Sequence, residues 1–287
     1  MAHPVIAVTG ATGTTGGATA RALIAQGFRP RLLVRDPAKA EVAFAGAADC
    51  VAAESGDLAS VRSALAGVDR LFVVAPPKPG DILRFEAAVV QAAREAGVRR
   101  LVKLSAFGAG PQAITYGRIH YAAEGITKAA NLEWTVLQPN FFMQNCLGSA
   151  GDIKVGTFHQ PWADAGASVI DAGDIGAVAA AALVRNDLIG RTLVLTGPES
   201  VTGNGHTAAL SAALGRTITY VPLSPEKFAG MLSQWGMEPY QATGVSELMD
   251  IWRKGWAAKV TPTVEEILGR PPRSFADFVR DHLAAFR

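Results

Sequence analysis

Short apolar runs rich in β-branched residues alternate with longer alanine-rich segments along the first half of the chain. Short runs of this kind indicate strands, and longer segments with apolar residues at helical spacing indicate helices. We expect strands near residues 4–9, 31–34, 49–53, 70–75, 100–104 and 133–137, and helices near residues 15–26, 37–44, 58–66, 82–97 and 117–130. This alternation predicts an α/β fold, in which a doubly wound parallel sheet is covered by helices on both faces.

The alternation weakens after Pro139, where glycine and proline become denser. We expect a strand near residues 190–195, a helix near 205–214 and a strand near 217–221. The chain is therefore predicted to contain a first domain over residues 1–150 and a smaller α/β substrate lobe over residues 151–287. Some segments of that lobe are expected to return to the first domain.

Composition narrows the class of protein without naming a function. With 287 residues, 49% of them hydrophobic, the chain can bury a large core in one large domain or two coupled ones. A net charge of +2, with both signs interspersed, gives no basic footprint for nucleic acid. The longest uncharged apolar run, residues 175–184, is far shorter than the roughly 20 residues that span a membrane. We therefore expect a cytoplasmic protein that binds neither nucleic acid nor membrane.

The chain contains two cysteines, Cys50 and Cys146, which form no CxxC motif and no disulfide framework. The sequence favours buried, small hydrophobic side chains at these positions over a redox or nucleophilic role.

The first expected strand runs directly into glycines at positions 10, 13 and 16, and then into a helical pattern. The first glycine permits a tight turn, the second lets backbone N–H groups approach a pyrophosphate, and the third lets helix and strand pack closely. The helix then directs its unpaired N–H groups at the phosphates. Because this turn ends the first strand, it predicts a Rossmann-type dinucleotide site at Gly10, Thr12, Gly13, Thr14, Thr15 and Gly16.

The residues after the second expected strand bear on the choice between NAD and NADP. A carboxylate here would bond the ribose 2′-hydroxyl of NAD, whereas a guanidinium would clamp the 2′-phosphate of NADP, and the chain offers both Arg35 and Asp36. Pro37 is expected to start a helix that Asp36 caps, and Lys39 adds positive charge. These features favour NADP, although Arg35 and Lys39 are also compatible with a merely solvated surface.

Two further strand ends are candidates for cofactor contacts. Asp57 is expected either to accept a hydrogen bond from the adenine amino group, with Leu58 beside the ring, or to cap the following helix. Ala75, Pro76 and Pro77 end the fourth strand, where small and rigid residues let the chain pass close to a ribose, or simply mark a loop.

Several motifs together resemble the NmrA-like family of atypical short-chain dehydrogenases/reductases. They are the Val-Thr-Gly-Ala-Thr-Gly start at residues 8–13, Val34-Arg35-Asp36-Pro37, residues 104–109, the His120/Glu124 pair, residues 134–145 and, in the tail, residues 215–216, 221–226 and 269–275. The resemblance covers nearly the whole chain. It implies either an NADPH-dependent reductase of quinones, azo dyes or triphenylmethane dyes, or a dinucleotide-sensing regulator with little catalysis.

The chain lacks the Tyr-x-x-x-Lys pair with which ordinary short-chain dehydrogenases move the proton of an alcohol. Tyr116 is followed four residues later by His120, and Tyr121 by Gly125. Alcohol oxidation is therefore not expected. A quinone or azo compound accepts hydride without such a pair, because the product anion is delocalised or is protonated by a modest acid.

The resemblance points to three candidate catalytic residues. Ser105, at the end of the fifth strand, stands where related enzymes keep a serine near the nicotinamide, and otherwise caps a loop. His120 is the expected proton donor because an imidazole titrates near neutrality, and Glu124 on the same helix face is expected to orient it or to raise its basicity. The other interpretation of His120 is a surface or packed residue. Regulator-like relatives often have lysine at the matching position, so the histidine favours a reductase.

The loop after the sixth strand matches the family's segment along the nicotinamide. Asn140 or Asn145 is expected to hold the carboxamide, while Phe141 and Phe142 either stack on the ring or belong to the core. Other aromatic residues are open to two interpretations. Trp235, Trp252 and Trp256 line an apolar pocket or pack in a core, and Phe158, His159, Pro161 and Trp162 cover an aromatic acceptor or form a surface hairpin.

The sequence thus predicts an NADPH-dependent reductase that passes hydride to a small conjugated aromatic acceptor, a quinone or an azo compound, with no flavin and no metal. The alternative is a regulator that senses NADP(H). Either a monomer or a homodimer is compatible with the sequence.

Overall fold

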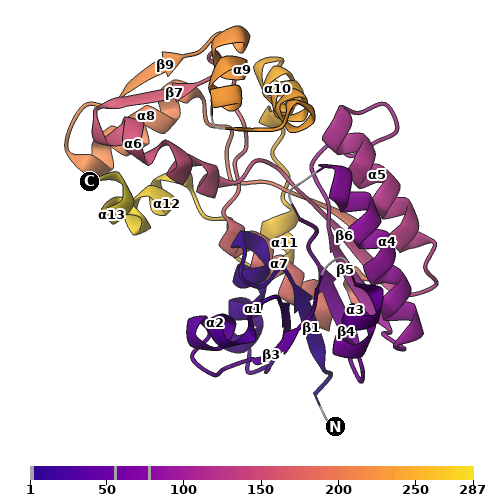
Figure 1. Cartoon of the computed structure of the whole chain (residues 1–287). Coiled ribbons are helices and arrows are strands. Elements are labelled where there is room, and N and C mark those ends of the chain that lie inside the picture. Colours follow the sequence, from indigo (N-terminus) through magenta and orange to yellow (C-terminus); the bar gives the residue numbers. More distant parts are fainter. Residues whose placement is uncertain (1–2, 55–56, 77–78, 235) are drawn as a thin grey trace. The chain divides into compact units, whose positions relative to one another are not determined.

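The computed structural model describes residues 3–54, 57–76, 79–234 and 236–287. The chain divides into two compact units, of which the first comprises Met1–Gln138 and Ala172–Val194 and the second Pro139–Asp171 and Leu195–Arg287 (Figure 1). The first unit thus ends at Gln138 rather than at residue 150, and a later segment does return to it. Of the residues singled out in the sequence, Pro77 and Trp235 lie outside the described residues.

A seven-stranded sheet forms the centre of the first unit within these described ranges. Its spatial order is β3 (Asp49–Ala52), β2 (Arg31–Val34), β1 (Ile6–Thr9), β4 (Arg70–Val73), β5 (Arg100–Leu104), β6 (Glu133–Pro139) and β8 (Arg191–Leu195). The pairs from β3 through β6 are parallel, with Val8 opposite both Leu32 and Phe72. The strand order reverses between β1 and β4, so the predicted doubly wound parallel sheet is confirmed.

Helices cover both faces of this sheet (Figure 1). One layer contains α1, packed on α7, and the other contains α3, α4 and α5 side by side. The helices of the first unit are α1 (Thr14–Ala25), α2 (Pro37–Ala43), α3 (Leu58–Ala64), α4 (Pro79–Glu95), α5 (Thr115–Lys128), α7 (Ala172–Val184) and the 3₁₀ turn η2 (Asn186–Leu188). A core that includes Leu65, Val89 and Leu101 lies under the second layer.

Local chemistry explains where two of these helices begin. Asp36 accepts a hydrogen bond from the Lys39 backbone N–H at 3.1 Å and precedes Pro37, so it caps α2 as predicted. Asp57 accepts from the Ala59 N–H at 2.8 Å and from the Ser60 N–H at 3.2 Å, which confirms its interpretation as the cap of α3.

Helix α7, which the sequence showed only as an apolar run, packs unusually close to α1. A Cβ on Gly176 would lie 2.5 Å from the carbonyl carbon of Ala18, so only glycine fits there. Most positions of α7 are buried, including Asp174, so the helix has no exposed polar face.

The second unit is built mainly of helices around a parallel strand pair, β7 (Thr157–Gln160) with β9 (Thr219–Pro222). Its other elements are η1 (Met143–Ser149), α6 (Ala150–Lys154), α8 (Gly203–Leu214), α9 (Pro225–Gln234), α10 (Pro239–Arg253), η3 (Trp256–Ala258), α11 (Thr263–Leu268), α12 (Phe275–Asp281) and α13 (Leu283–Phe286). The predicted strand near 217–221 and helix near 205–214 correspond to β9 and α8.

Aromatic side chains fill the core of the second unit. Trp162 stacks on Trp252 with ring centroids 4.0 Å apart, and Phe158 is fully buried beside Trp162. These three residues therefore belong to the core, and the expectation that Phe158 and Trp162 form a cover or a surface hairpin is wrong. Trp256 differs, because 69% of it is exposed.

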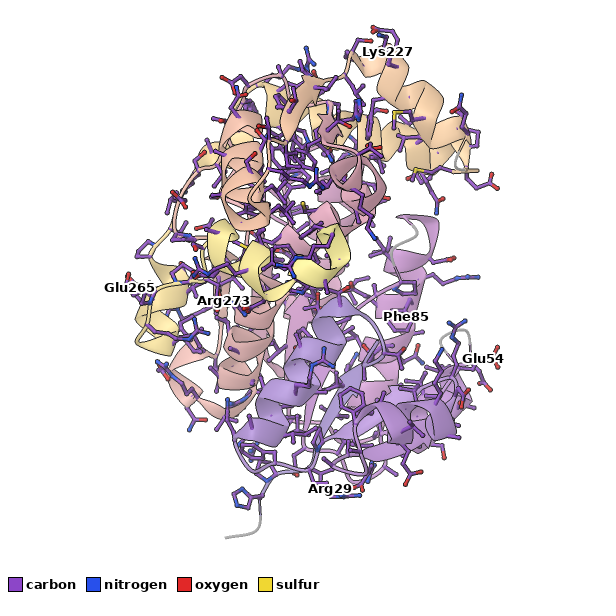
Figure 2. All side chains as sticks on the ribbon, turned by 90° about the vertical axis from the view of Figure 1, so that its left-hand side faces the viewer. Arg29, Glu54, Phe85, Lys227, Glu265 and Arg273 are labelled. Carbon is purple, nitrogen blue, oxygen red and sulfur yellow. The ribbon has the colours of Figure 1, made fainter. Side chains whose placement is uncertain are left out.

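Side chains on the outer rim of the first unit form exposed ion pairs of little consequence for stability. Arg29 and Glu54 both project from this rim (Figure 2), and Arg29 pairs with Asp49 at 2.6 Å. Among the described residues, no helix is both long and apolar enough to cross a membrane, and no cluster of His, Cys, Asp or Glu is placed to hold a metal ion.

Candidate functional site

The turn between β1 and α1 has the geometry that the three glycines predict. Gly10 has a φ of +61°, a left-handed conformation that favours glycine, and its carbonyl accepts from the Gly13 N–H at 2.9 Å. A Cβ on Gly16 would lie 2.3 Å from the Gly10 oxygen and 2.8 Å from the Thr9 oxygen. The third glycine is therefore required by the close approach of α1 to β1.

This turn also leaves the start of α1 open to a ligand. The N-cap residue is Gly13, which has no side chain to accept from the first helical N–H groups. Gly10, Thr12, Gly13 and Thr14 are exposed, whereas Thr15 and Gly16 are buried beneath them. The arrangement offers backbone donors and the positive end of a helix dipole to an anion, which is the fit that a pyrophosphate needs.

The end of β1 is fixed to the end of β4 by one side chain. Thr9 Oγ1 accepts from the Val74 N–H at 2.8 Å and donates to the Val74 carbonyl at 3.1 Å. The half-buried residues Ala75 and Pro76 follow directly. They therefore lie at the carboxyl edge of the sheet, next to the glycine turn.

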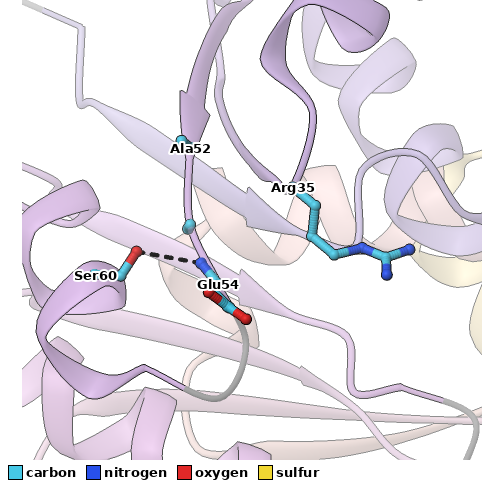
Figure 3. Close-up of a pocket in the computed structure, with 5 residues that line it drawn as sticks. Arg35, Ala52, Glu54 and Ser60 are labelled. Carbon is cyan, nitrogen blue, oxygen red and sulfur yellow. Dashed lines mark hydrogen bonds between the residues drawn. The ribbon is translucent and has the colours of Figure 1, made fainter.

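A cavity of about 330 Å³ lies beyond the ends of β2 and β3, lined by Arg35, Ala52, Ala53, Glu54 and Ser60 (Figure 3). Arg35 is exposed there, while Asp36 is engaged as the cap of α2. Lys39 is exposed one turn further on, and Leu58 is half-buried at the start of α3. The structure thus brings Arg35 to the cavity and commits the competing carboxylate to the helix.

The candidate catalytic residues follow β5 and lie on α5, but they pair differently from the expectation. Ser105 Oγ donates to Glu124 Oε1 at 2.6 Å, Gln138 Nε2 donates to the same oxygen at 2.8 Å, and Lys128 Nζ lies 3.0 Å from Glu124 Oε2. Glu124 is buried and its oxygens are occupied by these three groups. The expectation that Glu124 orients His120 is therefore wrong, and Glu124 instead holds Ser105.

His120 has a different environment from the one expected. Its Nδ1 atom is buried and has no hydrogen-bond partner in the described part of the chain. Burial, together with the positive charge of Lys103, lowers the pKa of the His120 imidazole to about 3. The expectation that His120 titrates near neutrality is therefore wrong, and the ring is neutral at pH 7.

Sequence reasoning missed a buried ion pair next to this histidine. Lys103 Nζ, on β5, lies 2.7 Å from Glu86 Oε1, on α4, and both side chains are almost completely buried. A lysine inside the apolar strand and a glutamate between Phe85 and Val89 on the apolar face of α4 were the available signals.

The loop after β6 belongs to the second unit, and contacts within that unit occupy part of it. The Asn140 side chain donates to Ser168 Oγ and to the Ala257 carbonyl, both at 2.8 Å, and accepts from the Phe141 N–H at 2.9 Å. Phe141 lies 4.4 Å from Trp252, centroid to centroid. The Asn140 side chain therefore holds its own unit together, which corrects its expected role at a carboxamide.

Phe142 and Asn145 are less engaged than their neighbours. Phe142 is half-buried and pairs with Ile170 as an isolated parallel bridge, and Asn145 is exposed.

His159, outside the aromatic core, lies 3.2 Å from Asp152. Cys146 is buried, and burial raises the pKa of its thiol to about 12, in agreement with a hydrophobic role.

Comparison with known proteins places this geometry among nucleotide-binding enzymes. Residues 10–186 match the family described as NAD(P)H-binding. The chain is 36% identical over 98% of its length to "NAD(P)H azoreductase" from Xenophilus azovorans, and the match covers 99% of that protein. It is 35% identical, over 98% of this chain and 99% of the other, to "(4-alkanoyl-5-oxo-2,5-dihydrofuran-3-yl)methyl phosphate reductase" from Streptomyces griseus.

A solved structure agrees with the sequence matches. The NADPH-dependent quinone oxidoreductase from Escherichia coli, in complex with NADPH, superimposes with a TM-score of 0.87 at 26% identity, covering 98% of this chain and 100% of that one. The glycine turn, the sheet order and these full-length matches agree with one another, and the protein belongs to the NAD(P)H-binding family that its motifs predicted.

Proposed function

We propose that the protein is an NADPH-dependent reductase that transfers a hydride to a small conjugated aromatic acceptor, such as a quinone or an azo compound, without a flavin. The observation that carries the proposal is the 36% identity, over 98% of the chain, to a protein named NAD(P)H azoreductase. A related solved structure is named for quinone reduction with NADPH. Both names describe flat, conjugated acceptors. We place the activity in the cytoplasm.

The glycine turn supports binding of the pyrophosphate. In this proposal, Thr14, Thr15 and Gly16 offer backbone N–H groups at the start of α1, and Gly10, Thr12 and Gly13 form the turn around the pyrophosphate. A Cβ on Gly16 would fill the space in which the helix meets the turn, so the cradle depends on glycine. When bound, NADPH supplies the hydride.

The surroundings of Arg35 favour NADPH over NADH. In this proposal, Arg35 and Lys39 bind the 2′-phosphate, because Asp36 is occupied by the Lys39 N–H and does not compete for the ribose hydroxyls. Asp57 keeps a second carboxylate oxygen for the adenine amino group while Oδ1 caps α3, and Leu58 flanks the ring.

The choice of acceptor follows from what the chain lacks. The sequence has no Tyr-x-x-x-Lys pair, so no tyrosine of lowered pKa stabilises an alkoxide. A quinone or azo group spreads the negative charge over its conjugated system after hydride addition. Such an acceptor needs positioning, exclusion of water and one proton, all of which a simpler site supplies.

Ser105 is proposed to position the nicotinamide end. Its hydroxyl hydrogen is directed to Glu124 Oε1 at 2.6 Å, so its oxygen presents a lone pair to an N–H donor such as a carboxamide. Glu124 fixes Ser105 in this orientation, with Gln138 and Lys128 holding the carboxylate in turn. Ala75 and Pro76 would border the ribose from the end of β4.

His120 is proposed to deliver the proton in its neutral form. A neutral imidazole donates from one ring nitrogen and accepts at the other, so it passes a proton without becoming a stable cation. The buried, unpartnered Nδ1 fits the accepting position. The sequence-based assignment of Phe142 and Asn145 to the nicotinamide stays a prediction, whereas Asn140 and Phe141 are engaged within the second unit.

The test is to follow the loss of NADPH absorbance with a panel of small quinones and azo dyes, with no flavin added. We expect turnover above about one per second with at least one acceptor, within the usual enzyme range. The same assay with NADH should give a lower kcat/KM. Tight NADPH binding without turnover across the panel would contradict the reductase and favour a dinucleotide sensor.

A further inference from the structure

A buried ion pair in the first unit lies close enough to His120 for its charge to act on that imidazole. Lys103 on β5 and Glu86 on α4 form an ion pair of 2.7 Å, and Lys103 Nζ also donates to the Leu104 carbonyl at 3.0 Å. Helices α4 and α5 pack side by side, and His120 on α5 is acted on by the charge of Lys103.

Two atoms of these three side chains are unpartnered. Glu86 Oε2 and His120 Nδ1 are buried, and neither finds a hydrogen-bond partner among the residues that the structure describes. A buried polar atom that is left without a partner is costly. Both atoms accept a hydrogen bond when Glu86 is ionised and His120 carries its hydrogen on Nε2, so internal water that donates to them would satisfy both.

A second ion pair on the same strand shows what a purely structural arrangement looks like. Arg100 lies 2.9 Å from Glu133 and also donates to the Leu183 carbonyl, the Arg185 carbonyl and Asn186 Oδ1. Its guanidinium is satisfied by groups that fasten the strand to the segment after α7. The Glu86–Lys103 pair makes fewer such contacts and leaves Glu86 Oε2 without a partner among the described residues. A buried ion pair is in any case weak evidence for a stabilising role.

We propose that Glu86 and Lys103 form a proton store behind His120, connected to Nδ1 by an internal water molecule, and that it recharges the histidine during each reduction. This inference rests on the proposed function of His120 as the proton donor. Glu86 and Lys103 touch neither acceptor nor cofactor in it, and they act through His120 as positioning residues.

The proton balance of one turnover is as follows. The acceptor gains a hydride from NADPH and one proton from His120 Nε2, and leaves with two hydrogens and two electrons. His120 Nδ1 takes a proton from the water, and the water takes one from Glu86. The pair contributes its single dissociable proton, which resides on Lys103 in the charged form and on Glu86 in the neutral form. After the product leaves, a solvent proton returns by the same route.

The charged groups around His120 support this role. Lys103 faces it from β5, Glu86 belongs to α4, and Glu124 on α5 acts on both of them. Burial raises the pKa of Glu86 and lowers the pKa of Lys103, while their mutual contact opposes both shifts. Burial thus brings the charged and neutral forms of the pair closer in free energy, as a proton store requires.

The first test replaces the whole pair, because a single change would leave a buried charge. The double variant Glu86→Leu/Lys103→Met keeps the volume and removes both charges. We expect kcat to fall at least about ten-fold with little change in the KM for NADPH, within what general acids contribute. The kcat should also decline as the pH rises, whereas the wild type stays flat. Unchanged kcat and pH profile would overturn the proposal.

Glu133→Gln is the matched control, since it weakens the structural pair on the same strand. We expect it to lower Tm and to leave kcat and its pH profile unchanged. If Glu133→Gln alters the pH profile as the double variant does, the effect is structural and the store is refuted.

The second test is independent of activity and so separates this inference from the proposed function. Nitrogen-15 NMR of the wild-type protein should show His120 neutral at pH 7 with its hydrogen on Nε2. In Glu86→Leu/Lys103→Met the pKa of His120 should rise, because the repulsion from Lys103 is lost. A hydrogen on Nδ1, or an unshifted pKa in the variant, would contradict the relay even if the enzyme reduces quinones.

Discussion

Each unit of the protein contains a histidine with a buried Nδ1 atom, and the two histidines have opposite surroundings. In the second unit, His206 Nδ1 lies 2.8 Å from the Thr202 carbonyl, and its ring packs 4.3 Å from Phe275 and 5.2 Å from Trp162. In the first unit, His120 Nδ1 is buried without a partner in the described ranges, and the charge of Lys103 disfavours protonation of the ring. One imidazole is hydrogen-bonded within a core, and the other has a buried nitrogen that no described residue satisfies.

The same contrast extends to the two units as a whole. The second unit engages the Asn140 side chain in contacts with its own Ser168 and Ala257, and Trp162 Nε1 is its one buried side-chain atom without a partner among the described residues. The first unit keeps open donors at the start of α1 and open acceptors near β5. Buried polar groups without partners are costly, so the open atoms of Glu86 and His120 point to a role beyond packing.

The largest expected effect separates a glycine of the ligand turn from one in the second unit. Gly16→Ala places a Cβ 2.3 Å from the Gly10 carbonyl oxygen, so the turn must shift, and we expect loss of measurable NADPH binding in a fluorescence titration. Gly230→Ala on α9 is the control, because none of the described atoms lies within 4 Å of the added Cβ. Normal binding by Gly16→Ala would show that the turn is not the phosphate site.

The two histidines should respond differently to removal. His120→Ala should lower kcat about 100-fold, as expected for loss of a general acid, with little change in NADPH affinity. His206→Ala should leave kcat per folded molecule unchanged and destabilise the protein by about 3 kcal/mol, because it opens a cavity among aromatic rings. Steady-state kinetics and urea unfolding measure both. Unchanged turnover in His120→Ala would remove this residue from the mechanism.

Acid should destabilise the protein through both histidines. Burial holds the pKa of His206 at about 4 and that of His120 at about 3, below the ordinary value near 6.5. The unfolded chain therefore binds more protons than the folded chain below pH 6.5. The contribution of the two neutral histidines to the free energy of unfolding is complete above that pH and is lost as the pH falls toward 4. Each histidine contributes on the order of 3 kcal/mol.

His206→Phe tests the share of the second unit in this pH dependence. The variant keeps an aromatic ring of similar size, so its unfolding free energy between pH 6.5 and 4 should fall less steeply than that of the wild type. Identical slopes would mean that His206 does not stay neutral in the folded protein.

A smaller effect is expected at the cofactor's adenosine end. Arg35→Ala should weaken NADPH binding about ten-fold and leave NADH binding within about two-fold, because only the 2′-phosphate loses a partner. Arg29→Ala is the matched control, an exposed arginine whose partners are Asp49 and the Gly46 carbonyl. Equal losses for both nucleotides, measured by calorimetry, would show that Arg35 does not select NADPH.

The fold was predictable where local signals were strong. The expected strands of the first half correspond to β1 through β6, and the glycine turn and the caps Asp36 and Asp57 were read directly from local chemistry. Helix α7 was not recognised, because burial on all sides removes the polar face that marks a helix.

The side-chain pairing in the site was less predictable. Spacing on one helix suggested that Glu124 serves His120, but Ser105 after β5 and Gln138 on β6 compete for the carboxylate. The pKa of His120 depends on Lys103, which only the packing of α5 on β5 brings near. The sequence likewise could not reveal that the Asn140 side chain donates a hydrogen bond to the Ala257 carbonyl, within the second unit.

Hydrogen–deuterium exchange with and without saturating NADPH would show whether the first unit binds the dinucleotide at its glycine turn. We predict added protection at residues 10–17 and around Arg35, with the aromatic core near His206 unchanged. Absence of added protection at residues 10–17, or protection confined to the second unit, would contradict it.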